Sequence, residues 1–294
     1  MSGPLAATTP DGSRLHLQHG PIDLIIEALG EKEAVAAAYR RAWDRFQPLL
    51  DQLVEELPLL RRPFGEEHRE LQGPVARRMA KAVSHFPGRF VTPMAAVAGA
   101  VADEVCDAMW TNDHALRLCA VNDGGDIAVR LTPGESFVVG LVPLPQRPAV
   151  LGTATIRAED PVRGVATSGR HGRSFTLGIA DAVTVLAADA ATADAASTLL
   201  ANAVDLPGHP AIDRTPAVEL APDSDLGDRL VTVGVGLLAD DEIQGALAAG
   251  LAAAARMRTA GTIEAAVLCL DGRTVAEGQV RPDAALGDAS SGRP

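Results

Sequence analysis

Aromatic rings and thiols are scarce in this chain. Aromatic residues make up 3% of the 294 residues, and only three residues are cysteines. So few rings argue against a stacking surface for single-stranded nucleic acid. Cys106, Cys119 and Cys269 lie far apart in apolar surroundings, without the short spacings of a zinc site or a disulfide framework. We therefore expect three buried, reduced thiols.

Positive charge is also in short supply. The chain has 26 Lys and Arg against 38 Asp and Glu, which gives a formal net charge of −12. Nucleic-acid binding needs a basic surface that neutralises phosphates, so we expect no nucleic-acid partner. No apolar run is long enough for a membrane span, and the first twenty residues or so lack the basic and apolar regions of a secretory signal. These absences predict a cytoplasmic protein without membrane contact.

Hydrophobic residues, mostly Ala and Val, are abundant at 47%, which is ample for a core. Polar, Pro- and Gly-containing termini predict a disordered N-terminus at 1–12 and a disordered tail at 282–294, on either side of a single domain at 13–281. Alternating patterns between Gly-, Pro- and Asp-rich turns predict strands at 14–18, 21–28, 116–121, 126–131, 136–141, 149–156, 164–167, 182–187, 230–236, 265–270 and 273–276.

Apolar residues at helical spacing predict the remaining elements. The expected helices cover 31–62, kinked or divided at Pro48, and then 74–84, 94–110, 190–204 and 240–259. The stretches 61–74 and 206–228 are expected to be irregular connections. The helix at 94–110 is rich in Ala and Gly, so it can pack closely within the domain or across a homodimer. Because the strands cluster in the middle of the chain between helices, the predicted fold class is α+β.

The first candidate site segment is Val121-Asn-Asp-Gly-Gly-Asp-Ile127. Gly124 and Gly125 allow positive φ and a close approach of the backbone to a ligand. The flanking residues Asn122, Asp123 and Asp126 offer polar contacts. Asn, Asp and Gly between two strands are also ordinary hairpin-turn residues. From spacing alone, the turn is the favoured interpretation.

The second candidate segment, residues 164–174, follows the end of a predicted strand. Small residues there expose backbone amides, and nearby guanidinium groups can help to hold a phosphate. A flexible polar loop explains the same composition equally well. The candidate binding residues of this segment are Thr167, Ser168, Gly169, Arg170 and Arg173.

The third candidate segment begins a predicted helix, for which Asp189 is the expected N-cap. Asp194 and Thr198 are four residues apart, so their oxygens face the same side of that helix. A carboxylate and a hydroxyl in this arrangement can help to hold Mg²⁺, which prefers hard oxygen ligands. The alternative, favoured by the residues alone, is a carboxylate that interacts with the helix dipole and a Thr that bonds back to the preceding turn.

Taken together and in this order, the three segments resemble the ApbE superfamily, whose members include FAD:protein FMN transferases. The matching motifs are Asn122-Asp-Gly-Gly-Asp126, Thr167-Ser-Gly169 and Ala193-Asp-Ala-Ala-Ser-Thr198. The sequence is more similar still to uncharacterised protein family 0280, a short branch of that superfamily. The matching stretches are Gly20-Pro-Ile-Asp23, Gly73-Pro-Val-Ala-Arg-Arg-Met79, Thr92-Pro-Met-Ala-Ala-Val-Ala-Gly99 and Ser174-Phe-Thr-Leu-Gly-Ile-Ala-Asp-Ala-Val183.

The resemblance implies a T-fold-like, antiparallel sheet backed by helices, with FAD as ligand, Mg²⁺ on Asp194 and Thr198, and flavin transfer as the activity. The chain departs from the transferases in two places. Their His-x-x-Asp-Pro-x-Thr-Gly stretch is replaced by the shorter segment 174–181, and their Lys is absent from residues 94–110. His171 is then the candidate catalytic proton-transfer group, because a His titrates near neutral pH. Two alternatives stay open: a non-catalytic accessory protein of a partner flavoenzyme, and a small-molecule enzyme that has lost flavin binding.

Overall fold

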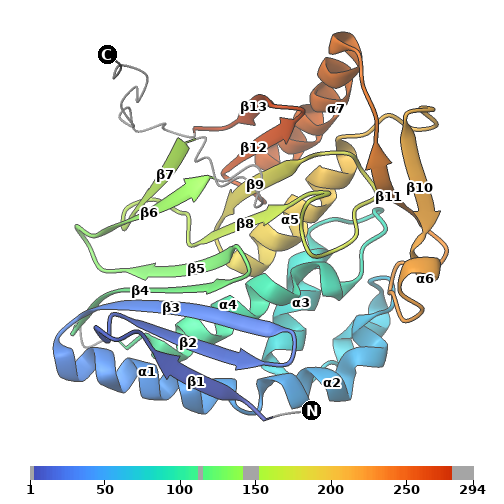
Figure 1. Ribbon diagram of the computed structural model, residues 1–294. Coiled ribbons are helices and arrows are strands. Elements are labelled where there is room, and N and C mark those ends of the chain that lie inside the picture. Colours follow the sequence, from blue (N-terminus) through green and yellow to red (C-terminus); the bar gives the residue numbers. More distant parts are fainter. Residues whose placement is uncertain (1–2, 112–114, 142–151, 280–294) are drawn as a thin grey trace, which may run out of the picture.

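The computed structural model describes residues 3–111, 115–141 and 152–279. Its main sheet has nine strands, and every neighbouring pair in it is antiparallel (Figure 1). In spatial order these are β1 (Leu5–Thr8), β2 (Arg14–His19), β3 (Ile22–Gly30), β4 (Leu116–Asp123), β5 (Asp126–Leu131), β8 (Gly164–Ser168), β9 (Ala182–Ala187), β12 (Ala265–Leu270) and β13 (Arg273–Glu277).

Two separate antiparallel ribbons accompany the main sheet. One pairs β6 (Ser136–Leu141) with β7 (Gly152–Arg157), and the other pairs β10 (Ile212–Pro216) with β11 (Leu230–Val235). The helices are α1 (Lys32–Phe46), α2 (Leu49–Leu60), α3 (Pro74–Ser84), α4 (Val97–Met109), α5 (Ala190–Ala203), α6 (Ala217–Leu220) and α7 (Asp240–Thr259), with the 3₁₀ turns η1 (Glu66–Glu70) and η2 (Pro93–Ala96).

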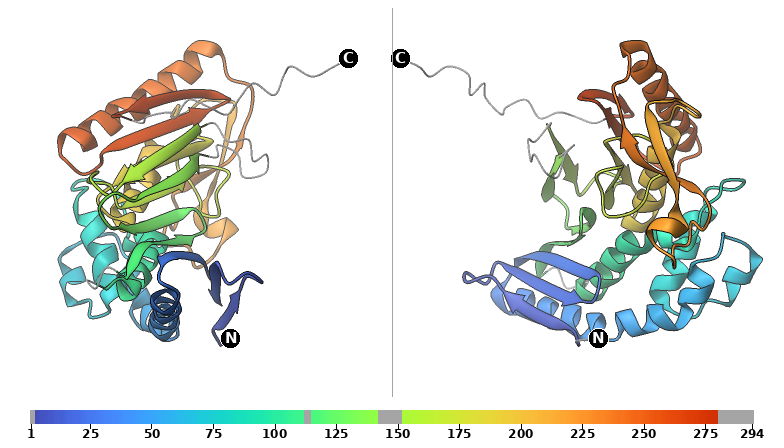
Figure 2. Two further views of the ribbon diagram at one scale, coloured as in Figure 1. Left: turned by 90° about the vertical axis from the view of Figure 1, so that its left-hand side faces the viewer. Right: turned by 45° about the vertical axis from the view of Figure 1, so that its right-hand side comes forward.

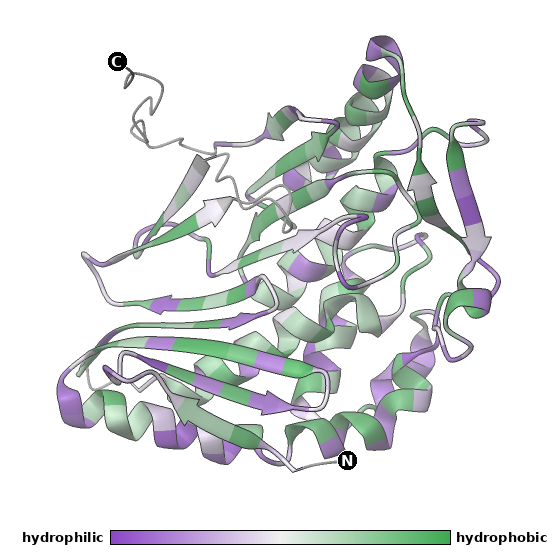
Figure 3. Cartoon of the chain, in the orientation of Figure 1, coloured by the Kyte–Doolittle hydropathy of each residue, from purple (hydrophilic) through white to green (hydrophobic). Residues whose placement is uncertain are grey.

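The sheet separates two hydrophobic cores, because successive residues of a strand face opposite sides. On β4, Cys119 and Val121 belong to the larger core beneath α1, α4, α5 and α7, whereas Leu118 and Ala120 belong to a smaller core beneath the β6–β7 ribbon. Hydrophobic residues accordingly run along both the strands and the central helices (Figure 3). All three cysteines are buried, as expected. The predicted α+β class, with an antiparallel sheet backed by helices, is confirmed.

Helices α4 and α5 pass each other in backbone contact. A Cβ atom on Gly99 would lie 2.2 Å from the carbonyl oxygen of Ala190, so only glycine fits at this crossing. Gly99, Ala100 and Ala102 of α4 are buried inside the chain. The close packing expected of this Ala- and Gly-rich segment therefore occurs within the chain, and these residues are not available for a homodimer interface.

Several expected boundaries hold, and several do not. Pro48 divides the long helix into α1 and α2, as predicted. The expectation of disorder at 1–12 is wrong for Leu5–Thr8, because this segment completes the sheet edge by pairing with β2. The connection 206–228 contains β10 and α6, and β11 pairs with β10 instead of joining β12 and β13. The expected tail at 282–294 and the start of the strand at 149–156 lie outside the described residues. Within the described ranges, no helix has the length and apolarity needed to cross a membrane.

Candidate functional site

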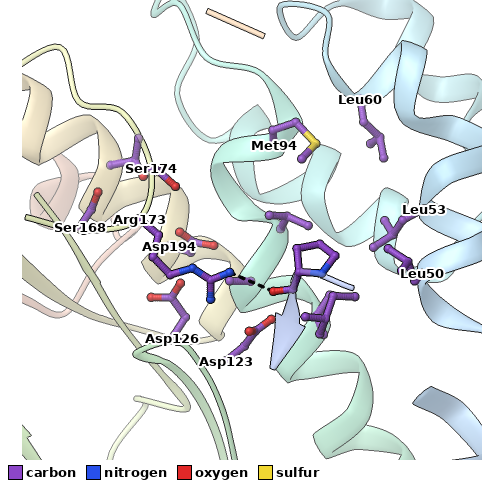
Figure 4. Close-up of a pocket in the computed structure, with 18 of the residues that line it drawn as sticks. Leu50, Leu53, Leu60, Met94, Asp123, Asp126, Ser168, Arg173, Ser174 and Asp194 are labelled. Carbon is purple, nitrogen blue, oxygen red and sulfur yellow. Dashed lines mark hydrogen bonds between the residues drawn. The ribbon is translucent and has the colours of Figure 1, made fainter. Parts of the chain in front are cut away.

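A cleft of about 540 Å³ opens at the ends of β4 and β8, between α2 and the first turn of α4. Its two sides differ in chemistry (Figure 4). The side formed by α2 is apolar, and Met94 and Val97 extend it. The facing side carries carboxylates, hydroxyls and a guanidinium group. A ligand held between these sides would therefore need both an apolar surface and polar groups.

The three candidate segments meet on the polar side of this cleft. The segments are distant along the chain, so their convergence at one cleft is not automatic. The candidate residues that line the cleft are Gly124, Asp126, Thr167, Ser168, Gly169, Arg173, Asp194 and Thr198.

Asp194 connects the cleft to the crossing of α4 and α5. Its Oδ2 atom accepts a hydrogen bond of 3.0 Å from the N–H of Gly99 in the first turn of α4. Asp103 of α4 does the reverse, because its Oδ2 atom accepts a bond of 2.9 Å from the N–H of Ala191 in the first turn of α5. Each helix thus supplies a carboxylate to the other's N-terminus, where free N–H groups favour negative charge. Asp194 lines the cleft, whereas Asp103 lies outside it.

Three carboxylates share the polar side of the cleft, and burial suppresses the ionisation of each. Burial raises the pKa of Asp194 to about 7. Burial likewise raises the pKa of Asp123 to about 7, although the Arg173 guanidinium opposes this shift. Burial, followed by the nearby charge of Asp194, raises the pKa of Asp126 well above its usual value. At neutral pH these buried carboxylates therefore favour the binding of either protons or an additional cation.

We expect a pH dependence of stability from Asp123, because its carboxyl pKa is higher in the folded chain than in the unfolded chain. The folded state then holds the proton more tightly, so the stabilisation from Asp123 is complete below a pH of about 4 and is lost as the pH rises towards 7. Asp123→Asn removes this ionisation. The variant should therefore gain stability relative to the parent by on the order of 1 kcal/mol per pH unit between about pH 5 and 7.

Denaturant unfolding of both proteins at several pH values measures this difference. Asp44→Asn is the matched control, since Asp44 is exposed on α1 and remote from the cleft. Asp44→Asn removes a carboxylate outside the cleft and supplies the baseline of the comparison. If the Asp123→Asn difference from the parent did not change with pH, the raised pKa of Asp123 would be refuted.

A second compartment of about 470 Å³ adjoins the cleft. The two compartments share several side chains, among them Met94, Asp126, Arg173, Asp194 and Thr198. The remaining lining of the second compartment is mixed. Its apolar residues include Phe90, Val91, Ala95, Phe175, Leu199 and Leu226, and its polar residues include Thr92, Asn202, Asp223, Ser224 and Asp225. The site therefore has a polar centre between an apolar side and a compartment with both apolar and polar groups.

Arg173 crosses the first compartment near this centre. Its Nη2 atom donates a hydrogen bond of 3.0 Å to the carbonyl oxygen of Pro21, in the turn between β2 and β3. Figure 4 shows the guanidinium group between that carbonyl and the carboxylates of Asp126 and Asp123. The arginine expected to contact an anionic ligand is thus inside the cleft.

Asn122 and Gly125 lie beside this cleft and line a smaller cavity of about 300 Å³. The Oδ1 atom of Asn122 accepts a bond of 2.8 Å from the N–H of Gly125, so it stabilises the hairpin turn. Gly124 and Gly125 have φ values of 65° and 118° in that turn. For Asn122 the structure therefore shows the turn role that the sequence allowed.

Arg170 and His171 do not line either compartment. Both bind Asp181, a buried carboxylate that needs charged partners: Nε of Arg170 lies 2.8 Å and Nε2 of His171 lies 3.2 Å from its Oδ1 atom. Its Oδ2 atom accepts a bond of 2.6 Å from the N–H of Asp271. The structure thus places Arg170 and His171 outside both compartments, where they anchor their loop to the sheet.

The sequence interpretation missed the apolar side of the cleft. Leu50, Leu53, Leu57 and Leu60 of α2 recur at helical spacing, and that pattern is the same for a helix that covers a core and for one that lines a cleft. Asp123 was noted as a polar neighbour of the glycines but was not chosen as a site residue. Asp123 matters because its burial raises its pKa, and that burial results from tertiary contacts that cannot be read from the sequence.

The donors on the polar side suit a hard cation such as Mg²⁺, because they are carboxylate and hydroxyl oxygens. Within the described residues, no three His, Cys, Asp or Glu side chains converge on one point. A cation near Asp194 and Thr198 would therefore also need backbone carbonyls, waters or ligand oxygens. The residues present fit an ion that is shared with a bound ligand.

Comparison with known proteins identifies the family of this chain. The family model described as AbpE bacteria matches residues 6–281. A UPF0280 protein of Methanosphaerula palustris is 33% identical over 205 residues, which cover 65% of this chain and 77% of that protein. A UPF0280 protein of Methanopyrus kandleri is 38% identical over 128 residues, which cover 44% of this chain and 48% of that protein. This chain is therefore a member of the ApbE-like superfamily. Within that superfamily, it belongs to the UPF0280 family.

Two solved structures show a distant similarity. The apo form of the flavinyl transferase ApbE of Pseudomonas stutzeri is 14% identical, with a TM-score of 0.44 and coverage of 93% of both chains. The flavin transferase ApbE of Vibrio cholerae is 13% identical, with a TM-score of 0.35 and coverage of 93% of this chain and 96% of that chain.

Proposed function

We propose that this protein is a cytoplasmic member of the ApbE-like superfamily that binds a flavin dinucleotide together with Mg²⁺ in the two-compartment cleft. The observation that carries the proposal is the order of its parts: an apolar side, a polar centre and a second compartment with both apolar and polar groups. FAD has the same order, with a flavin ring system, a pyrophosphate and an adenine. A single-ring anionic ligand would leave one compartment unused.

In this proposal each cleft residue has a distinct role. The leucines of α2 contact an apolar ring system, and Arg173 contacts the anionic linker. Thr167, Ser168 and Gly169 bind the ligand with hydroxyl and backbone groups. Asp194 and Thr198 hold the cation, with Asp126 next to them. A bound Mg²⁺ would stabilise negative charge at a pyrophosphate, which is the charge that a transfer reaction develops there.

The experiment is an FAD titration of the purified protein, monitored by absorbance and fluorescence, with and without Mg²⁺. We expect saturable binding that Mg²⁺ strengthens. Incubation of the complex with acceptor peptides that contain Ser and Thr then tests transfer, because moving FMN to a protein hydroxyl releases AMP. Absence of FAD binding at micromolar concentrations under both conditions would refute the proposal and leave a small-molecule enzyme without flavin.

A non-catalytic accessory protein of a partner flavoenzyme is the second candidate. It is favoured by the side chains of the cleft, since none of the described residues that line the two compartments is a histidine or a lysine. Proton transfer would then depend on the carboxylates alone. FAD binding without AMP release, whatever acceptor is supplied, is the result expected of this candidate.

A further inference from the structure

The outer wall of the second compartment is a single segment, residues 221–229, between α6 and β11. We call it the strap. Backbone bonds tie it to α6: Val218 donates to Gly227 and Ala217 donates to Arg229, both at 2.9 Å. The strap and α6 therefore form one unit. The strap residues that line the second compartment are Ala221, Asp223, Ser224, Asp225 and Leu226.

This unit is at one end of the β10–β11 ribbon, which stands outside the main sheet (Figure 2). At the other end of the ribbon, Ile212 packs into the main core. Between the two ends, the N–H of Thr232 donates a backbone bond of 2.9 Å to Thr176, and Arg214 forms an ion pair with Asp205. The ribbon is thus fixed along its length, and the strap, in which no residue is buried, is the part that can move.

Polar contacts attach the strap to the opposite wall of the cleft. Asp223 forms an ion pair of 2.9 Å with Arg61, the residue that ends α2. Asp225 accepts a hydrogen bond from the hydroxyl of Thr92. The guanidinium carbon of Arg229 lies 3.1 Å from the centre of the Phe90 ring. Arg61 and Asp223 are 162 positions apart in the sequence, so their ion pair joins two distant parts of the chain.

The Arg61–Asp223 pair is the outermost of these contacts. The Asp223 side chain is 75% exposed and that of Arg61 is 37% exposed. Exposed ion pairs stabilise a structure only slightly and are screened by salt. A contact of this kind holds a wall closed for most of the time but does not prevent it from opening.

We propose that the strap is a gate, closed by the Arg61–Asp223 pair, which controls access to the second compartment. When the pair breaks, the strap moves outward from the end of the ribbon and admits a ligand. The pair then re-forms behind the ligand. Only the choice of FAD as that ligand rests on the proposed function.

Thiol labelling of the ligand-free protein measures access directly. Ala95→Cys places a thiol in the second compartment, and Val54→Cys places one in the first compartment, away from the strap. The three native cysteines are buried and give a low background. Labelling with iodoacetamide, which is uncharged, is then compared among the parent, Arg61→Gln, Asp223→Asn and the double variant.

Each single substitution should raise the labelling rate at position 95 about three- to fivefold, because it removes one exposed ion pair. The double variant should add nothing, since both changes break the same pair. The rate at position 54 should stay constant. Equal rates in all variants, additive increases, or a parallel increase at position 54 would each overturn the gate.

Stopped-flow measurements with FAD and Mg²⁺ extend the test to ligand exchange. A gate changes the association and dissociation rates by the same factor and leaves Kd constant. A changed Kd without faster labelling would identify Arg61 as a ligand contact and overturn the gate. If FAD does not bind at all, the proposed function fails, whereas the labelling result at position 95 still decides whether the strap is a gate.

Discussion

Asp194→Asn should abolish Mg²⁺-dependent FAD binding while making the ligand-free protein more stable at pH 8. The carboxylate is buried, and its pKa of about 7 shows that ionisation is unfavourable in the folded chain. Asparagine removes that cost and retains an oxygen that can accept the bond from Gly99. It also removes a charged ligand of the cation, so Mg²⁺-dependent affinity should fall by on the order of 100-fold or more. Melting curves and FAD titrations with varied Mg²⁺ measure the two effects.

Asp103→Asn is the matched control for this substitution. Asp103 is also buried, has a pKa raised to about 6, and accepts a backbone bond from the first turn of the other helix. It does not line either compartment. Its replacement should therefore leave Mg²⁺-dependent binding unchanged. The alternative is that Asp194 serves only as a cap for α4. In that case Asp194→Asn would lower stability and leave FAD and Mg²⁺ binding as in the parent.

Local sequence signals were sufficient to predict most of the fold. Pro48 divided the long helix because it cannot continue a helix without losing a hydrogen bond. Asp189 begins α5 as the expected N-cap and accepts a bond of 2.7 Å from the N–H of Thr192. Pro74 occupies the first turn of α3, as predicted. Each of these features depends on neighbours within a few residues, and such neighbours are visible in the sequence.

The errors concern contacts between distant parts of the chain. Asp194 meets Gly99 across 95 positions, and no local pattern reveals that its carboxylate faces the N-terminus of another helix. His171 is of a residue type that often transfers protons in catalysis, but it contacts the buried carboxylate of Asp181 and lies outside the cleft. Strand β10 was missed because its Pro- and Asp-rich surroundings indicate a connection. The family motifs predicted which segments meet. The role of each side chain could not be predicted, because it depends on neighbours that are distant in the sequence.

Gly99→Ala should destabilise the protein by roughly 2–4 kcal/mol, although alanine normally stabilises a helix. The new methyl group would lie 2.2 Å from the carbonyl oxygen of Ala190 and 2.8 Å from the nitrogen of Ala191. These atoms belong to the backbone of α5, so they cannot move aside as a flexible side chain can. The two helices would have to separate, which would also move the N–H of Gly99 away from Asp194. We therefore expect weaker Mg²⁺-dependent FAD binding along with the loss of stability.

Gly245→Ala isolates the steric part of this effect. Gly245 lies within α7, is exposed, and has no atom within 4 Å of the position that a Cβ would occupy. Alanine there should raise stability by about 0.5–1 kcal/mol, since only helix propensity changes. Urea unfolding of both variants and the parent gives the two free-energy differences. Opposite signs are expected. If Gly99→Ala also stabilised the protein, α4 and α5 could not be in backbone contact, and the link between their crossing and the position of Asp194 would be lost.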